Sequence, residues 1–289
     1  MTSRALVLGG GGPVGFGLEI GMLKGLAEQG IHLSEADLIV GTSAGAGVGS
    51  QLASGVSTEE LYERQLRDVA SVTPAAKLTP DLEALGQVFE LWIGGSAMTQ
   101  EVRAEIGALA VTAKTGPEQE WTSSFNDELL GSSEWPEKRL VITAVAVRTG
   151  EFVSWDSSSA VPLPLAIAAS CSLPGIIPTV SIDGGRYMDG GLRSVSNADL
   201  ANGHDRVVII APSGAMDTPY DHNTRRQLEE EAQALRDGGS TVVVILPDAE
   251  ALAASGPNRM DVAFLTPAAE AGLRQAKRVG DGIKAVWHI

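Results

Sequence analysis

Two short apolar runs near the start of the chain are each followed by glycines. Residues 4–8 precede the glycines at 9–12, and residues 37–40 precede the segment 41–45 and a stretch of small residues. Such runs bounded by glycine favour buried strands. Apolar residues then recur at helical spacing: Phe16, Ile20, Leu23 and Ala27. The pattern predicts two successive strand–loop–helix units.

The middle of the chain has mainly helical periodicity. Stretches 58–70, 80–92 and 100–114 are separated by Pro and Gly, which predicts an α-helical insertion at about 57–135. Much of the aromatic content lies in this segment: Phe89, Trp92, Trp121 and Phe125. Packing in the core is the ordinary use of such residues, and a wall for an apolar ligand is the alternative.

Strand patterns return after the insertion. We expect a hairpin at 139–155, a second hairpin at 179–188, and buried strands at 206–211 and 241–246. Helices are expected at 162–170, 227–236 and 268–286. The sequence therefore predicts an α/β fold over residues 1–289, with a mostly parallel central sheet flanked by helices.

Composition narrows the classes of partner. With 289 residues, 44% of them hydrophobic, the chain can bury a substantial core. Its formal net charge of −15 and the absence of clustered Lys and Arg argue against a nucleic-acid partner. An anionic membrane would repel this average surface, but local docking through an apolar lip stays open.

The single cysteine and the N-terminal segment indicate a reducing compartment. Cys171 is the only cysteine, so no intrachain disulfide or multi-cysteine metal site is expected, and its thiol is interpreted as packed and unreactive. No signal peptide and no run of 18 apolar residues is visible. We expect a cytoplasmic protein with peripheral membrane contact; its oligomeric state stays open.

The segment 41–45, Gly-Thr-Ser-Ala-Gly, matches the pattern Gly-x-Ser-x-Gly between a strand and a helix. A tight turn flanked by glycines lifts a serine hydroxyl above the sheet edge, with the helix N-terminus directed at the reaction centre. Ser43 is therefore the candidate nucleophile. A chance match in a chain with 34 glycines is the alternative, so the context must decide.

The first glycine loop is the candidate oxyanion hole. Gly10, Gly11 and Gly12 have no side chains, so their N–H groups can approach a substrate carbonyl, and the amide of Ala44 is a further donor. The same loop matches the dinucleotide fingerprint Gly-x-Gly-x-x-Gly. That reading expects an acidic residue at the end of the second strand, where this chain has the segment 41–45 instead.

Three motifs in order resemble the patatin-like phospholipases, lipid acyl hydrolases of α/β architecture. The loop 10–15 is similar to their oxyanion loop, the segment 41–45 to their nucleophile elbow, and Asp189-Gly190-Gly191 to the motif that carries the aspartate of a Ser-Asp dyad. The resemblance covers most of residues 4–211, including the stretch 168–175. It implies a three-layer α/β/α fold, catalysis by Ser43 and Asp189, and no metal or organic cofactor.

The chain departs from the family pattern at two places. Val14 stands where members commonly have Arg or Lys, and Asn197-Ala198-Asp199 replaces Asn-x-Pro. Asp183-Gly184-Gly185 also competes with Asp189, but a hairpin turn explains Asp183 without catalysis. His204 and His222 follow in triad order, yet each has the polar context of a loop.

Together these features predict a serine acyl hydrolase that cleaves lipid or phospholipid esters through an acyl-enzyme, with the insertion as a lid or acyl groove. Two alternatives stay open: a nucleotide-binding oxidoreductase of Rossmann type, and a lipid-binding relative with weak or no catalysis.

Overall fold

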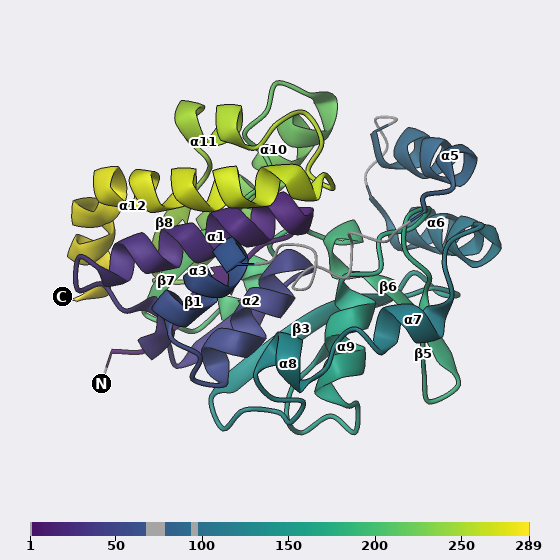
Figure 1. The fold of residues 1–289 in the computed structure, drawn as a ribbon, viewed down its shortest axis with the longest axis horizontal. Helices are drawn as coiled ribbons and strands as arrows, with labels where there is room; N and C mark the ends of the chain where they lie inside the picture. Colours follow the sequence, from purple (N-terminus) through teal and green to yellow (C-terminus); the bar gives the residue numbers. More distant parts are fainter. Residues whose placement is uncertain (1, 68–78, 94–97, 289) are drawn as a thin grey trace.

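A mixed β-sheet forms the centre of the molecule (Figure 1). The computed structural model describes residues 2–67, 79–93 and 98–288. In the described residues the sheet order is β5-β6-β3-β2-β1-β7-β8, and β4 also pairs with β3. The strands are β1 (Arg4–Leu8), β2 (Leu38–Gly41), β3 (Arg139–Ala146), β4 (Phe152–Trp155), β5 (Val180–Ile182), β6 (Gly185–Asp189), β7 (Arg206–Ile210) and β8 (Thr241–Ile245).

The strand pairings follow the sequence pattern. The pairs β1–β2, β1–β7, β2–β3 and β7–β8 are parallel, whereas β3–β4, β3–β6 and β5–β6 are antiparallel. The parallel strands are continuous apolar runs because helices cover both sheet faces. Both predicted hairpins, β3–β4 and β5–β6, are confirmed, as is the helix-flanked α/β sheet.

Helices lie on both faces of the sheet, which makes three layers. The α-helices are α1 (Gly12–Ala27), α2 (Ala44–Ala53), α3 (Thr58–Arg67), α5 (Leu82–Ile93), α6 (Gln100–Thr112), α7 (Glu118–Thr122), α8 (Asp127–Leu130), α9 (Leu163–Ser170), α10 (Pro219–Asp237), α11 (Ala249–Ala254) and α12 (Leu265–Trp287). Short 3₁₀ helices are η1 (Leu33–Glu35), η3 (Gly190–Leu192), η4 (Ala198–Ala201) and η5 (Val262–Phe264).

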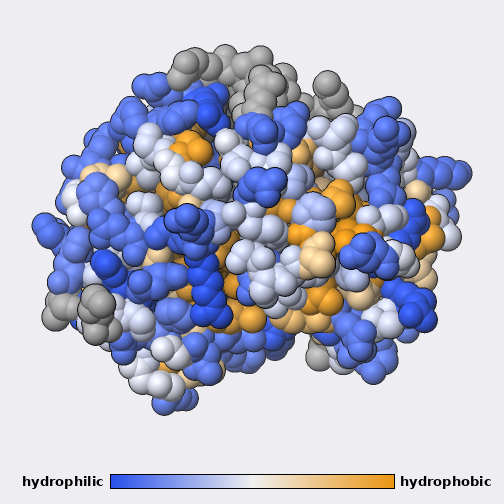
Figure 2. Space-filling model, turned by 90° about the horizontal axis from the view of Figure 1, so that it is seen from below, coloured by the Kyte–Doolittle hydropathy of each residue, from blue (hydrophilic) through white to orange (hydrophobic). Residues whose placement is uncertain are grey.

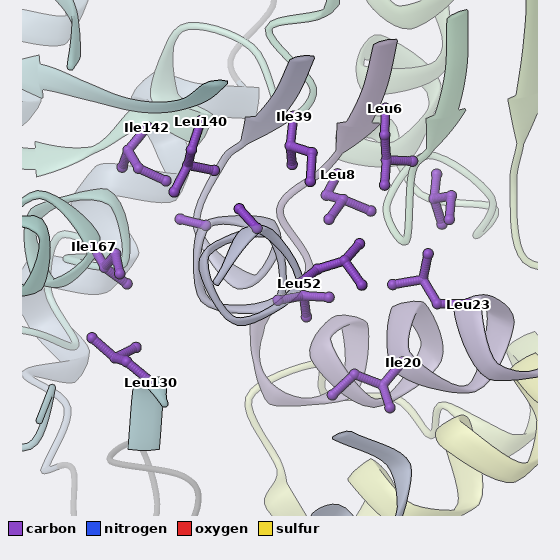
Figure 3. Close-up of a cluster of buried hydrophobic side chains, with 14 of the residues drawn as sticks. Leu6, Leu8, Ile20, Leu23, Ile39, Leu52, Leu130, Leu140, Ile142 and Ile167 are labelled. Atoms are coloured by element: carbon purple, nitrogen blue, oxygen red, sulfur yellow. The ribbon is translucent and has the colours of Figure 1, made fainter. Parts of the chain in front are cut away.

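Alternate residues of each central strand enter different cores. Leu6 and Leu8 of β1 lie on the face of the sheet that α1 and α2 cover, toward Leu23 and Leu52 in the close-up of Figure 3. Ala5 and Val7 enter the core under α10. The period of two along a strand sends successive side chains to opposite faces, so β1 is buried on both sides.

Helices α1 and α12 lie side by side along one face (Figure 1). Gly17, Gly21 and Gly25 are spaced four residues apart on α1, and a β-carbon at any of them would collide with the backbone of α12. Gly272 of α12 likewise faces the carbonyl of Leu18. Small residues at helix spacing thus allow a close approach that larger side chains would prevent.

The helical segment between β2 and β3 is confirmed in part. Helices α3, α5 and α6 occur where the periodicity predicts them, although residues 68–70 of the first lie outside the described ones. Val88 of α5 and Ile106 of α6 pack with Val145 of β3. These two helices therefore cover the end of β3 nearest Asp189. Asp189 belongs to β6 and pairs with Ala144 of β3.

Two helices near the C-terminus differ from the predictions. Helix α10 starts at Pro219 and not at 227, because Thr218 caps its N-terminus and proline is favourable in the first turn. Residues 219–226 are mostly polar, so they show no apolar periodicity from which these first helical turns could be predicted. Helix α11 was also not expected; Asp248 caps its six residues.

The register of β3 brings two strand ends together. Ile142 pairs with Gly41 of β2 and with Trp155 of β4, while Ala144 pairs with Asp189 of β6 and Val153 of β4. Strands β2 and β6 therefore share one edge of β3, opposite β4, and run toward each other. Their carboxyl ends meet, which places the residues after Gly41 beside Asp189.

The outer surface is mainly hydrophilic on the face drawn in Figure 2, with apolar side chains gathered in one area among polar ones. Across the described residues the large exposed apolar side chains are Leu82, Phe89 and Val111, all on α5 and α6. No helix in the described ranges has the length and apolar character needed to cross a bilayer.

Candidate active site

Ser43 occupies a strained turn between β2 and α2. Its φ of 53° and ψ of −118° lie in a region that few residues other than glycine adopt. A β-carbon at Gly45 would collide with the carbonyl of Leu8, and one at Gly41 would lie 2.7 Å from the Ala46 Cα. The flanking glycines are therefore required for this tight turn, and the turn exposes the hydroxyl at the start of a helix.

The Ser43 hydroxyl donates a hydrogen bond to Asp189. Ser43 Oγ lies 2.8 Å from Asp189 Oδ2, and Asp189 Oδ1 accepts the N–H of Gly191 at 2.7 Å. Although Ser43 is the residue before α2, its side chain makes no capping bond to that helix. The hydroxyl is thus paired with a carboxylate, the arrangement that a serine nucleophile and its base need.

Burial gives Asp189 the proton affinity of a base. Desolvation raises the pKa of its carboxyl from 3.8 to about 7, and the hydrogen bonds from Gly191 and Ser43 oppose that rise. The residue is only 4% exposed. Near neutral pH the group can both accept and release a proton, as general acid–base catalysis requires.

A buried amide joins the segments that carry Ser43 and Asp189. Asn197 Nδ2 lies 3.0 Å from Thr42 Oγ1, 3.3 Å from Thr143 Oγ1 and 3.3 Å from the Gly190 carbonyl. Thr42 and Thr143 also hydrogen-bond each other, at 2.9 Å. Asn197 therefore links the residue before Ser43, the middle of β3 and the residue after Asp189. The replacement of Asn-x-Pro by Asn-Ala-Asp leaves this asparagine in place.

The C-terminal end of α9 supports the turn at Ser43. Ser170 Oγ accepts the N–H of Ser43 at 2.9 Å, and Cys171 Sγ donates to the Ser43 carbonyl at 3.2 Å. Burial and the nearby Asp189 carboxylate raise the pKa of the Cys171 thiol, which keeps it protonated. Sequence reasoning did not assign these contacts to Ser170, because they depend on the long-range placement of α9.

The glycine loop 10–12 borders Ser43, with one correction to the predicted donors. Gly10 N–H donates to the Val195 carbonyl at 2.7 Å, so it is engaged within the protein and the prediction for Gly10 is wrong. In the described part of the chain no partner is found for the N–H of Gly11, Gly12 or Ala44. Gly12 (φ 61°) and Ala44 each begin a helix, where the first N–H groups lack helical acceptors.

A cavity of about 680 Å³ opens over Ser43 and Asp189. Its lining includes Ser43, Asp189, the glycine loop and Ala44. The rest is mainly apolar and comes largely from the helical segment and the approach to Asp189: Leu85, Phe89, Trp92, Trp121, Phe125, Leu129, Leu173, Ile176 and Ile177. All four aromatic residues singled out in the sequence border this space, while Trp121 and Phe125 also pack in the core.

The competing acid and the histidines lie elsewhere. Asp183 is exposed at the β5–β6 turn, with a φ of 48°. His204 Nδ1 is 3.0 Å from the Ala201 carbonyl, and His222 Nε2 is 2.9 Å from Asp217 Oδ1. The serine–acid contact is thus made by Asp189. The described residues also contain no cluster of three or more His, Cys, Asp or Glu side chains suited to a metal ion.

The chain belongs to the patatin-like phospholipase family, whose model matches residues 6–202. Curated relatives include uncharacterized NTE family proteins of Mycobacterium bovis and Mycobacterium tuberculosis, each 28% identical over 188 residues. The match covers 65% of this chain and 42% of each relative, so the chain spans less than half the length of those proteins.

Two solved structures are similar to the chain at lower identity. VipD from Legionella pneumophila is 14% identical with a TM-score of 0.46, and the match covers 97% of this chain and 67% of VipD. Full-length ExoU of Pseudomonas aeruginosa, solved with SpcU, is 15% identical with a TM-score of 0.45, covering 100% of this chain and 53% of the other.

Proposed function

We propose that the protein is a serine acyl hydrolase that cleaves the carboxylic ester bonds of lipids through a Ser43–Asp189 dyad. The observation that carries this proposal is the 2.8 Å contact between Ser43 Oγ and Asp189 Oδ2 beneath a mostly apolar cavity. Membership of a lipid hydrolase family supports it.

Asp189 acts as the base in the first half of the reaction. Its carboxylate takes the hydroxyl proton while Ser43 Oγ attacks the ester carbonyl, and a tetrahedral oxyanion forms. The N–H groups of Gly11, Gly12 and Ala44 stabilise that oxyanion, assisted by the N-termini of α1 and α2. Protonated Asp189 then gives its proton to the leaving alcohol, which yields an acyl-enzyme.

Water completes the cycle. Asp189, again ionised, takes a proton from water as the water oxygen attacks the acyl carbonyl, and the proton returns to Ser43 Oγ when the acid leaves. The basic side chain missing at Val14 is not needed for these steps, because backbone donors and helix dipoles supply the positive potential.

The apolar lining fits an acyl chain. Residues of α5, α7 and α8 form much of the wall, so the helical segment acts as an acyl groove within a single domain of residues 1–289. Exposed Leu82 and Phe89 on α5 form an apolar lip that brings a cytoplasmic enzyme into peripheral contact with a membrane.

Hydrolysis of p-nitrophenyl esters of increasing chain length tests the proposal. We expect turnover by the wild-type protein, a preference for chains longer than acetate, and loss of turnover in Ser43→Ala. Full activity of Ser43→Ala would refute the proposed function. Binding of long-chain lipid without turnover by the wild-type protein would favour a non-catalytic lipid-binding relative.

A further inference from the structure

Arg259 has the only cationic side chain among the described residues that line the cavity. The other charged residues of the lining are Asp189, the proposed base, and Asp221. Arg259 lies in the loop between α11 and η5, beyond residues 6–202 that match the family model. The family comparison therefore gives this arginine no role.

A buried carboxylate fixes the guanidinium. Asp221 of α10 has a side chain only 1% exposed, and it forms an ion pair with Arg259 Nη2. Asp221 also accepts the Gly214 N–H at 2.7 Å and the Thr218 hydroxyl at 2.7 Å. Because the carboxylate is held on three sides, it orients Arg259 at little further cost in side-chain entropy.

Most donors of Arg259 remain free for a ligand. Among the described residues, the Arg259 side chain makes one hydrogen bond, which uses one of its five N–H groups and goes to Asp221. The Arg259 Cζ lies 5.9 Å from the centroid of the Tyr220 ring, and that ring meets Trp92 edge to face at 5.3 Å. The guanidinium thus borders the apolar wall of the cavity, and four of its N–H groups can donate to a ligand.

The same residue lies beside the glycine loop. The Arg259 carbonyl accepts the N–H of Val14 at 3.3 Å, and a β-carbon at Gly12 would lie 2.8 Å from that carbonyl. The backbone of Arg259 thus packs against the glycine loop, and Arg259 lines the same cavity as Gly11, Gly12 and Ser43. In a protein of net charge −15, a local cation is needed to hold an anionic group there.

We propose that Arg259 binds the phosphate group of a lipid ester whose acyl carbonyl lies at Ser43, and so selects phosphate-bearing substrates over neutral esters. A guanidinium recognises phosphate through paired charge-assisted hydrogen bonds. The contact with Asp221 involves Nη2 of Arg259 and leaves its other N–H groups available for such a pair. This proposal rests on the hydrolase function proposed above.

The binding arm of the test does not depend on turnover. In the Ser43→Ala protein, the affinity for hexadecyl phosphate relative to hexadecanol is measured by tryptophan fluorescence, since Trp92 and Trp121 border the cavity. We expect Arg259→Gln to lower this ratio at least tenfold and Arg259→Lys to lower it less. Arg274→Gln, at an exposed arginine of α12, is the matched control and should leave the ratio unchanged.

Two outcomes of the binding measurement would overturn the proposal. An unchanged ratio in Arg259→Gln would give the arginine a structural role only. Displacement of hexadecyl phosphate by an equal concentration of inorganic phosphate would assign the site to free phosphate. If Arg259→Gln fails to fold with Asp221 left unpaired, the double variant Asp221→Asn/Arg259→Gln removes both charges and must show the same lowered ratio.

A kinetic arm separates this proposal from the proposed function. The ratio of kcat/KM for phosphatidylglycerol to that for a neutral diacylglycerol should fall at least tenfold in Arg259→Gln. If neither substrate is hydrolysed by the wild-type protein, the hydrolase function fails while the binding arm still decides on Arg259. If both proteins hydrolyse the substrates and the ratio is the same in Arg259→Gln as in wild type, the proposed role of Arg259 is rejected while the hydrolase function stands.

Discussion

The hydroxyl of Ser43 lies 2.8 Å from a carboxylate oxygen of Asp189, although the two residues are 146 positions apart in the chain. The register of β3 produces this contact, because β2 and β6 end against the same edge of that strand. The proposed base is a buried aspartate that accepts hydrogen bonds from Ser43 and Gly191, with no histidine between acid and serine.

Removal of either member of the dyad should abolish hydrolysis. We expect Ser43→Ala and Asp189→Asn each to lower kcat by about 10³-fold or more, as loss of a nucleophile or base does in known serine hydrolases. The asparagine keeps the shape and a hydrogen bond to Ser43 but cannot take the proton. Rates are measured with a p-nitrophenyl ester. His204→Ala and His222→Ala are the controls, and a comparable loss in either would contradict the dyad.

The rate should depend on pH through the ionisation of Asp189. Its pKa of about 7 means that the carboxylate, the active base, forms as the pH rises through neutrality. The kcat/KM of wild-type protein should therefore rise to a plateau above pH 8 and be about 100-fold lower at pH 5. A profile flat from pH 5 to 8 would show that no such base controls the reaction.

Asp189 should also lower stability at high pH. The folded-state pKa is raised from 3.8 to about 7, so the folded protein binds the extra proton between these values. The free energy of unfolding contributed by this group is full below pH 4 and is lost as the pH rises to 7, by up to about 4 kcal/mol. Asp189→Asn should thus be more stable than wild type at pH 8 and similar to it at pH 4.

Urea unfolding of both proteins at the two pH values measures this difference. Glu19, another buried carboxyl with a raised pKa, is present in both proteins and cancels in the comparison. Equal stability of the two proteins at pH 8 would contradict the burial of an ionisable group at position 189.

Asn197 should position the dyad. Asn197→Gly keeps the left-handed backbone (φ 49°) but removes the amide that reaches Thr42, Thr143 and Gly190. We expect kcat to fall by about 100-fold with KM little changed, because small displacements of reacting groups cost that much. Stability should fall by about 1–3 kcal/mol as buried acceptors lose their donor. Equal kcat in variant and wild type would mean that the amide supports only the fold.

The turn at Ser43 should tolerate no side chain at Gly45. A β-carbon there collides with the Leu8 carbonyl, so Gly45→Ala should destabilise the protein by about 1–3 kcal/mol. Gly86→Ala is the matched control in α5, where no atom lies within 4 Å of an added β-carbon, and it should stabilise by about 0.5–1 kcal/mol. Both are measured by denaturant unfolding; similar effects of the two substitutions would contradict the tight turn.

The sequence predicts most of the fold, because alternating apolar runs and glycine breaks report burial locally. Thr218 and Pro219 signal the start of α10, yet the polar turn that follows carries no apolar period. The chemistry of Ser43 and Asp189 could likewise be predicted from local motifs. The contacts of Ser170 and Asn197, and the engagement of the Gly10 N–H by Val195, could not, because they join segments that only the tertiary fold brings together.

Covalent labelling identifies the nucleophile and tests whether Asp189 activates it. The protein is treated with a fluorophosphonate near pH 8 and the modified peptide is mapped by mass spectrometry. We expect a single adduct on Ser43, absent in Ser43→Ala and formed much more slowly in Asp189→Asn. An adduct on another residue, or labelling of Ser43 at the wild-type rate in Asp189→Asn, would contradict the proposed dyad.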